Sequence, residues 1–468
     1  MGFNKILTKS KVECKKLLNV LLKKYEYVSI LGVASKGCRF RVDSKNTFIS
    51  DSDIEYGYVC KIFNGEGYSE YSFSKIIGED INKLANKIID SITLKNVSNR
   101  VNVDKLSEEE MVKVFNRDDE GALTDSEIVE KLTDLKNKME NYDKRIINAI
   151  SMYNKIEISK FFISSKKDLE QFYTWSNCYI IPVARNESQI KNKMFVGGSY
   201  SSKEAFKECY DNLDDVCHIA IELLDAKPIK PGVYDVITDP SITGLIAHEA
   251  FGHGVGMDMF VKNRAKSVDY IDKYVASPLI SMHDGACATD SVASYFFDDD
   301  GVLAHDTLII KDGILKSGIS DSLSALELKT IPTGNGRRES FERKAYTRMT
   351  NTFFSRGTSK VEDMIKSIKY GFYLCDTNNG MEDPKNWQIQ CTAEYAREIK
   401  DGKFTGVIVS PVVISGYVPD VLKSITMVSD DFKVSGSGYC GKGHKEWVRV
   451  SDGGPHLKAK VKLGWLIE

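Results

Sequence analysis

The sequence predicts an α+β fold, in which a mixed N-terminal α/β domain is followed by a strand-dominated C-terminal domain. Three observations support this prediction. Helical and strand-like periodicities alternate up to about residue 225, and strand-like runs dominate from residue 233 onward. Two prolines in "KPIKPGVY" (227–234) mark the change between them. We therefore expect domains at residues 1–228 and 229–468.

The N-terminal domain is expected to combine helices with an antiparallel meander. Apolar residues at helical spacing predict helices at 9–25, 75–92, 127–142 and 204–225. Short alternating runs separated by turn residues predict strands at 27–33, 38–42, 47–50, 56–63, 68–73, 145–153, 155–164 and 169–184. The charged stretch 106–125 is weakly patterned, so we expect a surface excursion there.

The C-terminal domain is expected to consist mostly of strands linked by Gly- and Asp-rich turns. The strand-like runs lie at 233–239, 306–321, 394–416 and 456–467. One helix is predicted directly after the first of them. Asp239 can cap that helix and Pro240 suits its first position, and no breaker follows until residue 252.

Composition argues against several classes of function. The chain has 468 residues, 42% of them apolar and 28% charged, and a formal charge of −2. Because this balance generates no global field, we expect neither nucleic acid nor an anionic membrane as a partner. The ten cysteines are scattered without a C-x-x-C pair, and the N-terminus lacks a secretory pattern. We therefore expect reduced thiols and a cytoplasmic location.

The segment "DPSITGLIAHEAFGHGV" (239–255) carries two histidines and a glutamate. On a straight helix His248 and His253 would lie roughly 140° apart and could not bind one ion. A π-bulge adds one residue to the turn and would bring both imidazoles to the same side. Unwinding at Gly252 would have the same effect. A packed, hydrogen-bonded histidine pair explains the spacing equally well, so a third ligand is needed to decide.

If the segment binds metal, zinc chemistry follows. Catalytic zinc takes three protein ligands and a water, and the ion lowers the pKa of that water. Glu249, next to His248, would then act as the general base, taking the proton of the zinc-bound water and returning it to a leaving amine. The predicted activity is hydrolysis of a peptide bond.

The candidate third ligand lies in "VSGSGYCGKGH" (434–444). Its glycines match G-x-G-x-x-G, which makes a nucleotide-binding loop the rival interpretation. However, Gly443 stands where a P-loop needs Ser or Thr, and a strand-like run follows instead of a helix. We expect a glycine-rich loop that presents the Cys440 thiolate, with His444 as the alternative ligand.

These segments, together with "TGNGRRESFERKAYTRMTNT" (333–352), resemble the TldD/PmbA family of metallopeptidases. The resemblance implies a zinc peptidase that cleaves small, unfolded or extended peptides in a site enclosed within a dimer. In that family a catalytic TldD-type subunit pairs with an inactive PmbA/TldE-type subunit that lacks the metal motif. This chain retains His248, Glu249, His253 and Cys440, so it resembles the active member. The resemblance leaves a homodimer and a heterodimer with a PmbA/TldE-like subunit open, and a non-catalytic peptide- or protein-binding subunit is the alternative.

Two charged segments have less specific interpretations. Arg337, Arg338, Arg343, Lys344 and Arg348 form a basic stretch, which we expect to be mostly a solvated, salt-bridged surface. One of its arginines could instead bind the C-terminal carboxylate of a peptide. The acidic run "FFDDDG" (296–301) lacks the spacing of a calcium loop, so we expect a hairpin corner.

Overall fold

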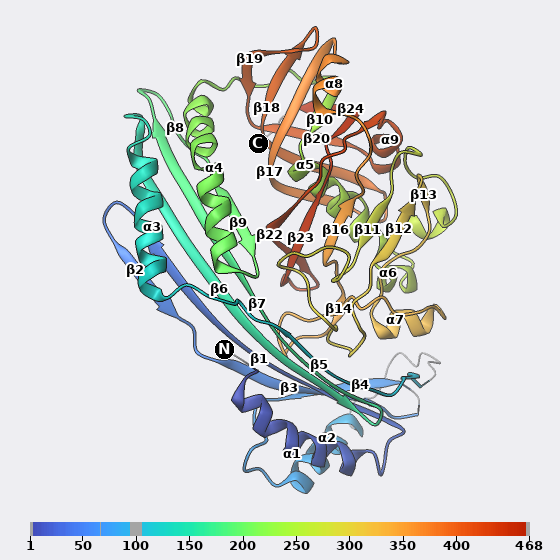
Figure 1. Cartoon of the computed structure of the whole chain (residues 1–468). Helices are drawn as coiled ribbons and strands as arrows, with labels where there is room; N and C mark the ends of the chain where they lie inside the picture. Colours follow the sequence, from blue (N-terminus) through green and yellow to red (C-terminus); the bar gives the residue numbers. More distant parts are fainter. Residues whose placement is uncertain (1–2, 66, 94–104, 465–468) are drawn as a thin grey trace.

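The computed structural model describes residues 3–65, 67–93 and 105–464, and it confirms the α+β class. A long, curved N-terminal sheet runs beneath a compact C-terminal half built of further sheets (Figure 1). Helices α1 and α2 lie on the side of the long sheet away from that half. The change from one half to the other falls between a short helix, η1 (Leu223–Asp225), and strand β10 (Gly232–Thr238). The division at residues 228/229 stays a prediction.

The N-terminal sheet is nine-stranded within the described residues, with a main path β4-β3-β1-β6-β7-β5. Strand β2 pairs with β1, and β8 and β9 pair with β7. The strands are β1 (Tyr27–Val42), β2 (Thr47–Asp51), β3 (Glu55–Phe63), β4 (Tyr68–Phe73), β5 (Met111–Arg117), β6 (Ile146–Ser164), β7 (Lys167–Arg185), β8 (Ile190–Asn192) and β9 (Phe195–Ser199). The antiparallel meander is thus present, and several of the expected short runs are joined into long strands.

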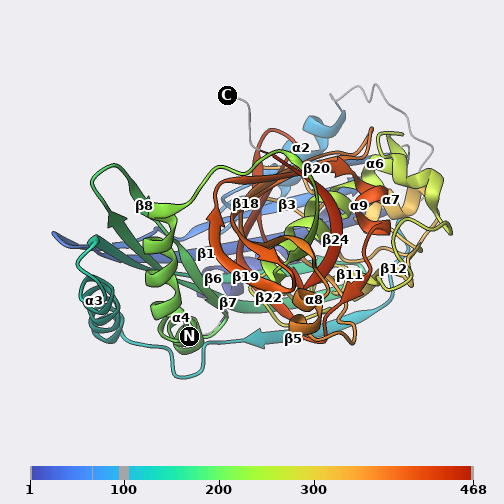
Figure 2. The ribbon, with the colours of Figure 1, turned by 90° about the horizontal axis from the view of Figure 1, so that it is seen from above.

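The helices of this half bury apolar stripes against the sheet. They are α1 (Lys5–Leu21), α2 (Ile81–Thr93), α3 (Asp125–Glu140) and α4 (Ser202–Glu222). In α3, Ile128, Leu132, Leu135 and Met139 recur at helical spacing and are all buried. Its first turn is fixed by a capping box between Thr124 and Glu127. Seen from above, α3 and α4 lie at one end of the sheet, beside the C-terminal half (Figure 2).

The expectation of a mere surface excursion at 106–125 is wrong for residues 111–117. These residues form β5, which pairs in parallel with β7 along its whole length. Val112 and Val114 are 79% and 73% exposed. An edge strand that buries so little apolar surface carries little of the alternation by which strands are recognised in a sequence.

The C-terminal half contains a sheet that closes on itself. Its path is β10-β17-β18-β20-β24, and β24 also pairs with β10, so the five strands form a barrel-like ring, visible in Figure 2. Strands β19 and β21 are attached to it. The strands are β17 (Tyr370–Asp383), β18 (Gln388–Lys400), β19 (Lys403–Val409), β20 (Val412–Tyr417), β21 (Met427–Val428) and β24 (Leu457–Gly464). The remainder of the run expected at 456–467 lies outside the described residues.

A second, six-stranded sheet of this half has the order β13-β12-β11-β16-β23-β22 within the described part of the chain. Its strands are β11 (Met282–Asp284), β12 (Thr307–Lys311), β13 (Ile314–Leu315), β16 (Asn351–Phe354), β22 (Lys433–Lys442) and β23 (Glu446–Gly454). A two-stranded ribbon is formed by β14 (Gly336–Arg337) and β15 (Tyr346–Thr347). Short helices are α6 (Met257–Val261), η4 (Lys266–Tyr270), α7 (Ser322–Glu327), α8 (Val361–Lys366) and α9 (Val418–Lys423).

The segment that carries the two histidines lies between these two sheets. It comprises α5 (Pro240–Leu245), a π-helix η2 (Ile246–Gly252) and a 3₁₀ turn η3 (His253–Val255). On one side it contacts β17 and β18, and on the other β16 and β23. Its apolar residues belong to the largest buried cluster of the half. The core of the C-terminal half therefore holds this segment in place.

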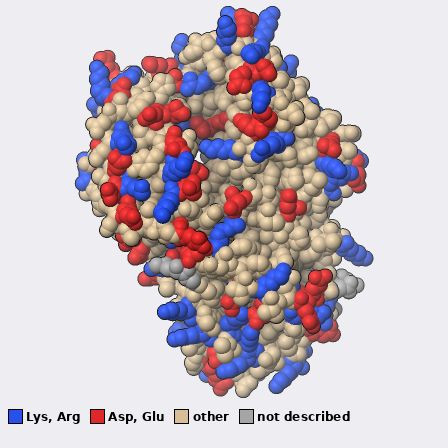
Figure 3. Space-filling view, in the orientation of Figure 1, with Lys and Arg blue, Asp and Glu red and all other residues tan. Residues whose placement is uncertain are grey.

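Two surface properties complete the description. No helix in the described residues is both long enough and apolar enough to cross a bilayer. On the face shown in Figure 3, basic and acidic side chains are interspersed over the side formed by α3 and α4, without separation by sign.

Candidate metal centre

The helix that follows β10 begins and bends where the sequence predicts. The Asp239 carboxylate accepts a hydrogen bond from the backbone N–H of Ile242 at 2.8 Å, and Pro240 is the first helical residue. From Ile246 to Gly252 the backbone is π-helical, so the first of the two expected alternatives, the π-bulge, is present. The extra residue per turn places the two histidines on one side of the segment.

His248, His253 and Cys440 come together at this point. Their ligand atoms all lie within 4.8 Å of one another, and they form the one such group found among the described residues. His253 Nε2 is 3.6 Å from Cys440 Sγ. The two imidazole rings are 5.2 Å apart and nearly perpendicular, at 85°. The group joins residues 187 positions apart in the chain.

Glu249 lies at the edge of the same group. Its Oε2 atom is 3.8 Å from His253 Nε2, and its side chain is 14% exposed. Strand β17 passes directly behind it, because a Cβ atom at Gly380 would stand 2.5 Å from Glu249 Cγ. A glycine at position 380 therefore leaves room for the carboxylate beside the histidines.

Cys440 lies in a strand, and the expectation of a glycine loop is wrong. It belongs to β22 and pairs with Val448 of β23. The buried guanidinium of Arg348 donates hydrogen bonds to the carbonyls of Cys440 and Glu446, which holds the hairpin from the side. Regular strand geometry thus aims the thiol at the helix. His444, the alternative ligand, is exposed in the turn of this hairpin and is not part of the group.

The electrostatics of the group favour a thiolate among imidazoles. Burial disfavours the charged sulfur, but the neighbouring His253 and His248 hold the pKa of the Cys440 thiol well below its usual range. Burial would lower the pKa of His248, yet the hydrogen bond and charge of Cys440 raise it to about 9. Without a metal, a proton on His248 balances the charge of the thiolate. A divalent cation could take the place of this proton.

The residues present fit a zinc ion. Two imidazoles and one thiolate are the nitrogen and sulfur donors that zinc prefers, with Zn–N near 2.0–2.1 Å and Zn–S near 2.3 Å. Tetrahedral geometry with those lengths separates a nitrogen and a sulfur ligand by about 3.6 Å, and His253 Nε2 and Cys440 Sγ have that separation. His248 is 4% exposed, yet its Nδ1 has no hydrogen-bond partner in the part of the chain that the structure describes. Such an orphaned buried nitrogen indicates a site shaped for another group.

Comparisons with known proteins support this interpretation. Residues 231–462 match the family model described as the PmbA/TldA metallopeptidase C-terminal domain. A metalloprotease of Methanocaldococcus jannaschii is 29% identical over 401 residues, which cover 85% of this chain and 88% of the relative. The chain belongs to the TldD/PmbA family.

Other relatives extend the comparison. A protein of Saccharolobus solfataricus named zinc metalloprotease TldD homolog is 25% identical over 88% of this chain and 90% of its own length. Among solved structures, TldE of Thermococcus kodakarensis aligns with a TM-score of 0.76 at 17% identity, covering 97% of this chain and 100% of its own. A Thermotoga maritima protein, described as a suggested modulator of a DNA gyrase, aligns with a TM-score of 0.78 at 16% identity, covering 97% and 100%. At these identities the solved structures show a shared fold.

Sequence reasoning does not identify some residues near the candidate metal centre of this TldD/PmbA-family chain. The carboxylate of Glu382 is buried beside Gly254, and neither of its oxygens has a hydrogen-bond partner among the described residues. Burial and the nearby charge of Glu249 raise the pKa of Glu382 to about 9, so it is uncharged at neutral pH. Lys442 bonds to Asp258 at 2.8 Å and ties β22 to α6. Nothing local in the sequence signals these contacts, because each joins segments distant in the chain.

The basic stretch is not mainly a solvated surface. Arg348 and Arg338 are only 2% and 7% exposed, and Arg338 pairs with Glu70 of the N-terminal sheet at 2.9 Å. Arg337 donates to two backbone carbonyls. Only Arg343 and Lys344 are exposed as expected. The surface expectation is therefore wrong for the three arginines that join distant segments.

The acidic run is more than an exposed hairpin corner. Asp298, Asp299 and Asp300 are 1%, 3% and 6% exposed. Asp300 forms a buried ion pair with Lys61, and Asp299 pairs with Lys160 at 2.5 Å. Both lysines belong to the N-terminal sheet, so the run serves to join the two halves.

Proposed function

We propose that this protein is a zinc-dependent peptidase in which His248, His253 and Cys440 hold the metal and Glu249 is the general base. The observation that carries the proposal is the convergence of these three ligand atoms within 4.8 Å, with a carboxylate oxygen 3.8 Å from one of them. The metalloprotease names of the relatives point to the same class of reaction.

Each residue has a role in hydrolysis. Bound Zn²⁺ would supply Lewis acidity, which makes water more acidic and polarises a carbonyl. Glu249 accepts a proton at its carboxylate from the attacking water and returns it to the leaving amine. Cys440 is held in place by the β22–β23 hairpin, and Arg348 fixes that hairpin by donating a hydrogen bond to the Cys440 carbonyl. Strand β17 packs closely against Glu249, since Gly380 lies beside its side chain.

The substrates we propose are small, unfolded or extended peptides. Strand β22 carries Cys440 and is an edge strand of its sheet in the described residues. An extended peptide can add to such an edge through main-chain hydrogen bonds, which demand little of its side chains. Its backbone would then run past the metal ligands. Broad sequence tolerance and a strong dependence on disorder in the substrate follow from this mode of binding.

The alternative is a non-catalytic peptide- or protein-binding subunit on the same fold. The likeness to TldE supports only the fold, and the complete set of ligands with Glu249 favours catalysis over this alternative. We further propose that the protein works as a dimer, either with itself or with a PmbA/TldE-like subunit.

Metal removal tests the proposal. We expect the purified protein to contain about one zinc per chain and to cleave an unstructured reporter peptide. Dialysis against a chelator should abolish cleavage, and added zinc should restore it, with metal content measured alongside. Full activity in demonstrably metal-free protein would contradict the zinc mechanism, whereas bound zinc without cleavage of any unstructured peptide would favour the non-catalytic alternative.

A further inference from the structure

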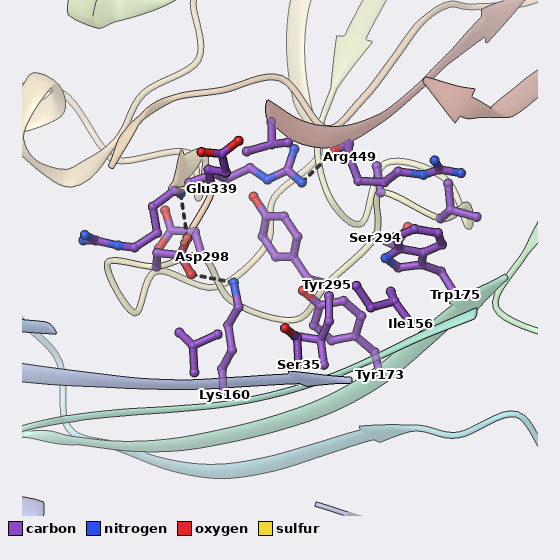
Figure 4. A pocket seen from close by; sticks show the side chains of 18 of the residues that line it. Ser35, Ile156, Lys160, Tyr173, Trp175, Ser294, Tyr295, Asp298, Glu339 and Arg449 are labelled. Atoms are coloured by element: carbon purple, nitrogen blue, oxygen red, sulfur yellow. Dashed lines mark hydrogen bonds and ion pairs between the residues drawn. The ribbon is translucent and has the colours of Figure 1, made fainter. Parts of the chain in front are cut away.

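A cavity of about 210 Å³ lies between the N-terminal sheet and the back of the β22–β23 hairpin (Figure 4). Strands β1, β6 and β7 form one wall, and the segments 292–299, 337–340 and 447–449 form the others. Neighbouring residues of a strand point to opposite faces. Tyr439 accordingly lines this cavity, while the next residue, Cys440, points to the metal group. The cavity and the candidate metal centre thus lie on opposite faces of one hairpin.

Aromatic rings form part of the cavity wall. They come from both halves of the molecule: Tyr173, Trp175, Tyr295, Phe297, Tyr439 and Trp447. In Figure 4 the first two rise from the N-terminal strands, and Tyr295 faces them from the other half. Such surfaces favour flat apolar groups, and pockets of this kind fix their ligands with a few placed polar groups.

Two guanidinium groups at the cavity, those of the buried Arg449 and the half-buried Arg337, lack carboxylate partners among the described residues. Arg449 is 7% exposed and lies over the Trp175 ring at 4.3 Å and the Tyr439 ring at 4.8 Å. Its Nη2 donates to the Asn177 side chain and to the Gly436 carbonyl, while Nε and Nη1 have no hydrogen-bond partner among the described residues. Arg337 donates hydrogen bonds to the backbone carbonyls of Met349 and Arg449 and lies over the Tyr295 ring.

The acidic residues at the cavity are already engaged. Asp299 is paired with Lys160 at 2.5 Å. Asp298 accepts hydrogen bonds from three backbone N–H groups, and burial raises its pKa well above the usual range. Glu339 accepts a bond from the backbone N–H of Trp447 at 2.9 Å. The cavity therefore retains uncompensated positive charge next to aromatic rings.

We propose that this cavity is a second binding site, distinct from the metal centre, for a small carboxylate that carries an aromatic group. The guanidinium groups of Arg337 and Arg449 receive the carboxylate, because arginine recognises planar anions through charge-assisted hydrogen bonds. The aromatic walls receive the ring. A free aromatic acid and the C-terminal residue of a short peptide offer the same chemistry.

Binding should be measured on metal-stripped full-length protein, so that the outcome does not depend on the peptidase proposal. The probes are N-acetyl-phenylalanine, its C-terminal amide and phenethylamine. Their binding is measured by calorimetry and by tryptophan fluorescence. We expect saturable 1:1 binding of the acid, and binding of the amide weaker by about tenfold or more, since hydrogen bonds to charged groups are the stronger ones. Acetyl-Gly-Gly-Phe mimics the C-terminus of a peptide. Its binding would identify a peptide terminus as the ligand, whereas binding of N-acetyl-phenylalanine alone would identify a free acid in a closed cavity.

Three variants locate the site. Arg337→Met should weaken binding of the acid by about tenfold. Because that change could disturb the fold, Ser35→Trp provides a second test: Ser35 lines the cavity from β1, and the indole should fill it. Lys36→Trp is the matched control, since the exposed Lys36 neighbours Ser35 on the same strand. Absence of saturable binding, equal binding of acid and amide, tighter binding of phenethylamine, or unchanged binding in folded Ser35→Trp would each overturn the proposal.

Discussion

At the scale of single residues, Glu249 is the side chain on which the proposed proton transfer depends. We expect Glu249→Gln to fold and to keep its zinc, because the glutamine amide fills the same space beside Gly380. Hydrolysis should fall by about 10²–10⁴-fold, since the amide cannot accept the proton of water. Steady-state cleavage of an unstructured peptide measures this. Glu362→Gln on the exposed side of α8 is the control and should be neutral. Wild-type turnover in Glu249→Gln would refute the role of Glu249.

Residue identities near the metal group could be predicted only where the sequence itself constrains them. The five-residue interval between His248 and His253 requires an extra residue in the turn, and the π-helix supplies it. Arg348 and Glu382 gave no comparable signal. Their roles arise from contacts with Cys440 and Gly254, which lie far away in the chain.

At the scale of elements, the start of α5 should be sensitive to pH. Burial and the charge of Asp376 raise the pKa of the capping Asp239 to about 7. Because the folded-state pKa exceeds the usual value near 3.9, this group's favourable contribution to stability is complete below about pH 4. It is lost as the pH rises through about 7.

Asp376→Asn also removes an ion pair with Lys193 at both pH values, so it should change stability more favourably at pH 8 than at pH 5. It removes the like charge, and asparagine tolerates the positive φ of 52° at this position. A gain of about 1 kcal/mol in the free energy of unfolding corresponds to a rise of roughly 2–4 °C in melting temperature for a domain of about 150–250 residues. Thermal unfolding at both pH values measures it, with Asp363→Asn on the exposed surface of α8 as control. An equal shift at both pH values would contradict the assignment.

Elements were predicted well where they bury a regular apolar stripe and poorly where tertiary context decides. Helix α3 shows the first case, with four buried apolar residues at helical spacing. The hairpin around Cys440 shows the second. Its glycines suggested a loop, but pairing with β23 keeps residues 433–442 in a strand. The edge strand β5 was missed because it buries little of its apolar surface.

At the scale of the whole molecule, buried ion pairs join the two halves, and Lys61–Asp300 links β3 to the acidic run. Removing one partner leaves a buried charge without compensation, which costs about 3–5 kcal/mol. Lys61→Met should therefore lower the denaturation midpoint strongly, while Lys61→Met/Asp300→Asn should recover much of the loss. Urea unfolding compares the two with the exposed control Lys9→Met. If Lys61→Met matched wild type, the pair would not join the halves.

The arrangement of the whole molecule also explains why the third ligand is the assignment to test hardest. Cys440 reaches the histidines only because β22, β23 and the helix between the sheets pack as they do. His444, four residues further along the same hairpin, is exposed. His444→Ala is therefore a matched control, because His444 lies in the same hairpin as Cys440 but outside the group of metal ligands.

The most direct measurement is zinc per chain in Cys440→Ala and His444→Ala, at matched folded fraction by circular dichroism. With three protein ligands needed beside water in a catalytic site, Cys440→Ala should lose most of its zinc and its peptidase activity. His444→Ala should keep about one zinc per chain and its activity. Retained zinc in Cys440→Ala together with lost zinc in His444→Ala would contradict the assignment of Cys440 as the third ligand.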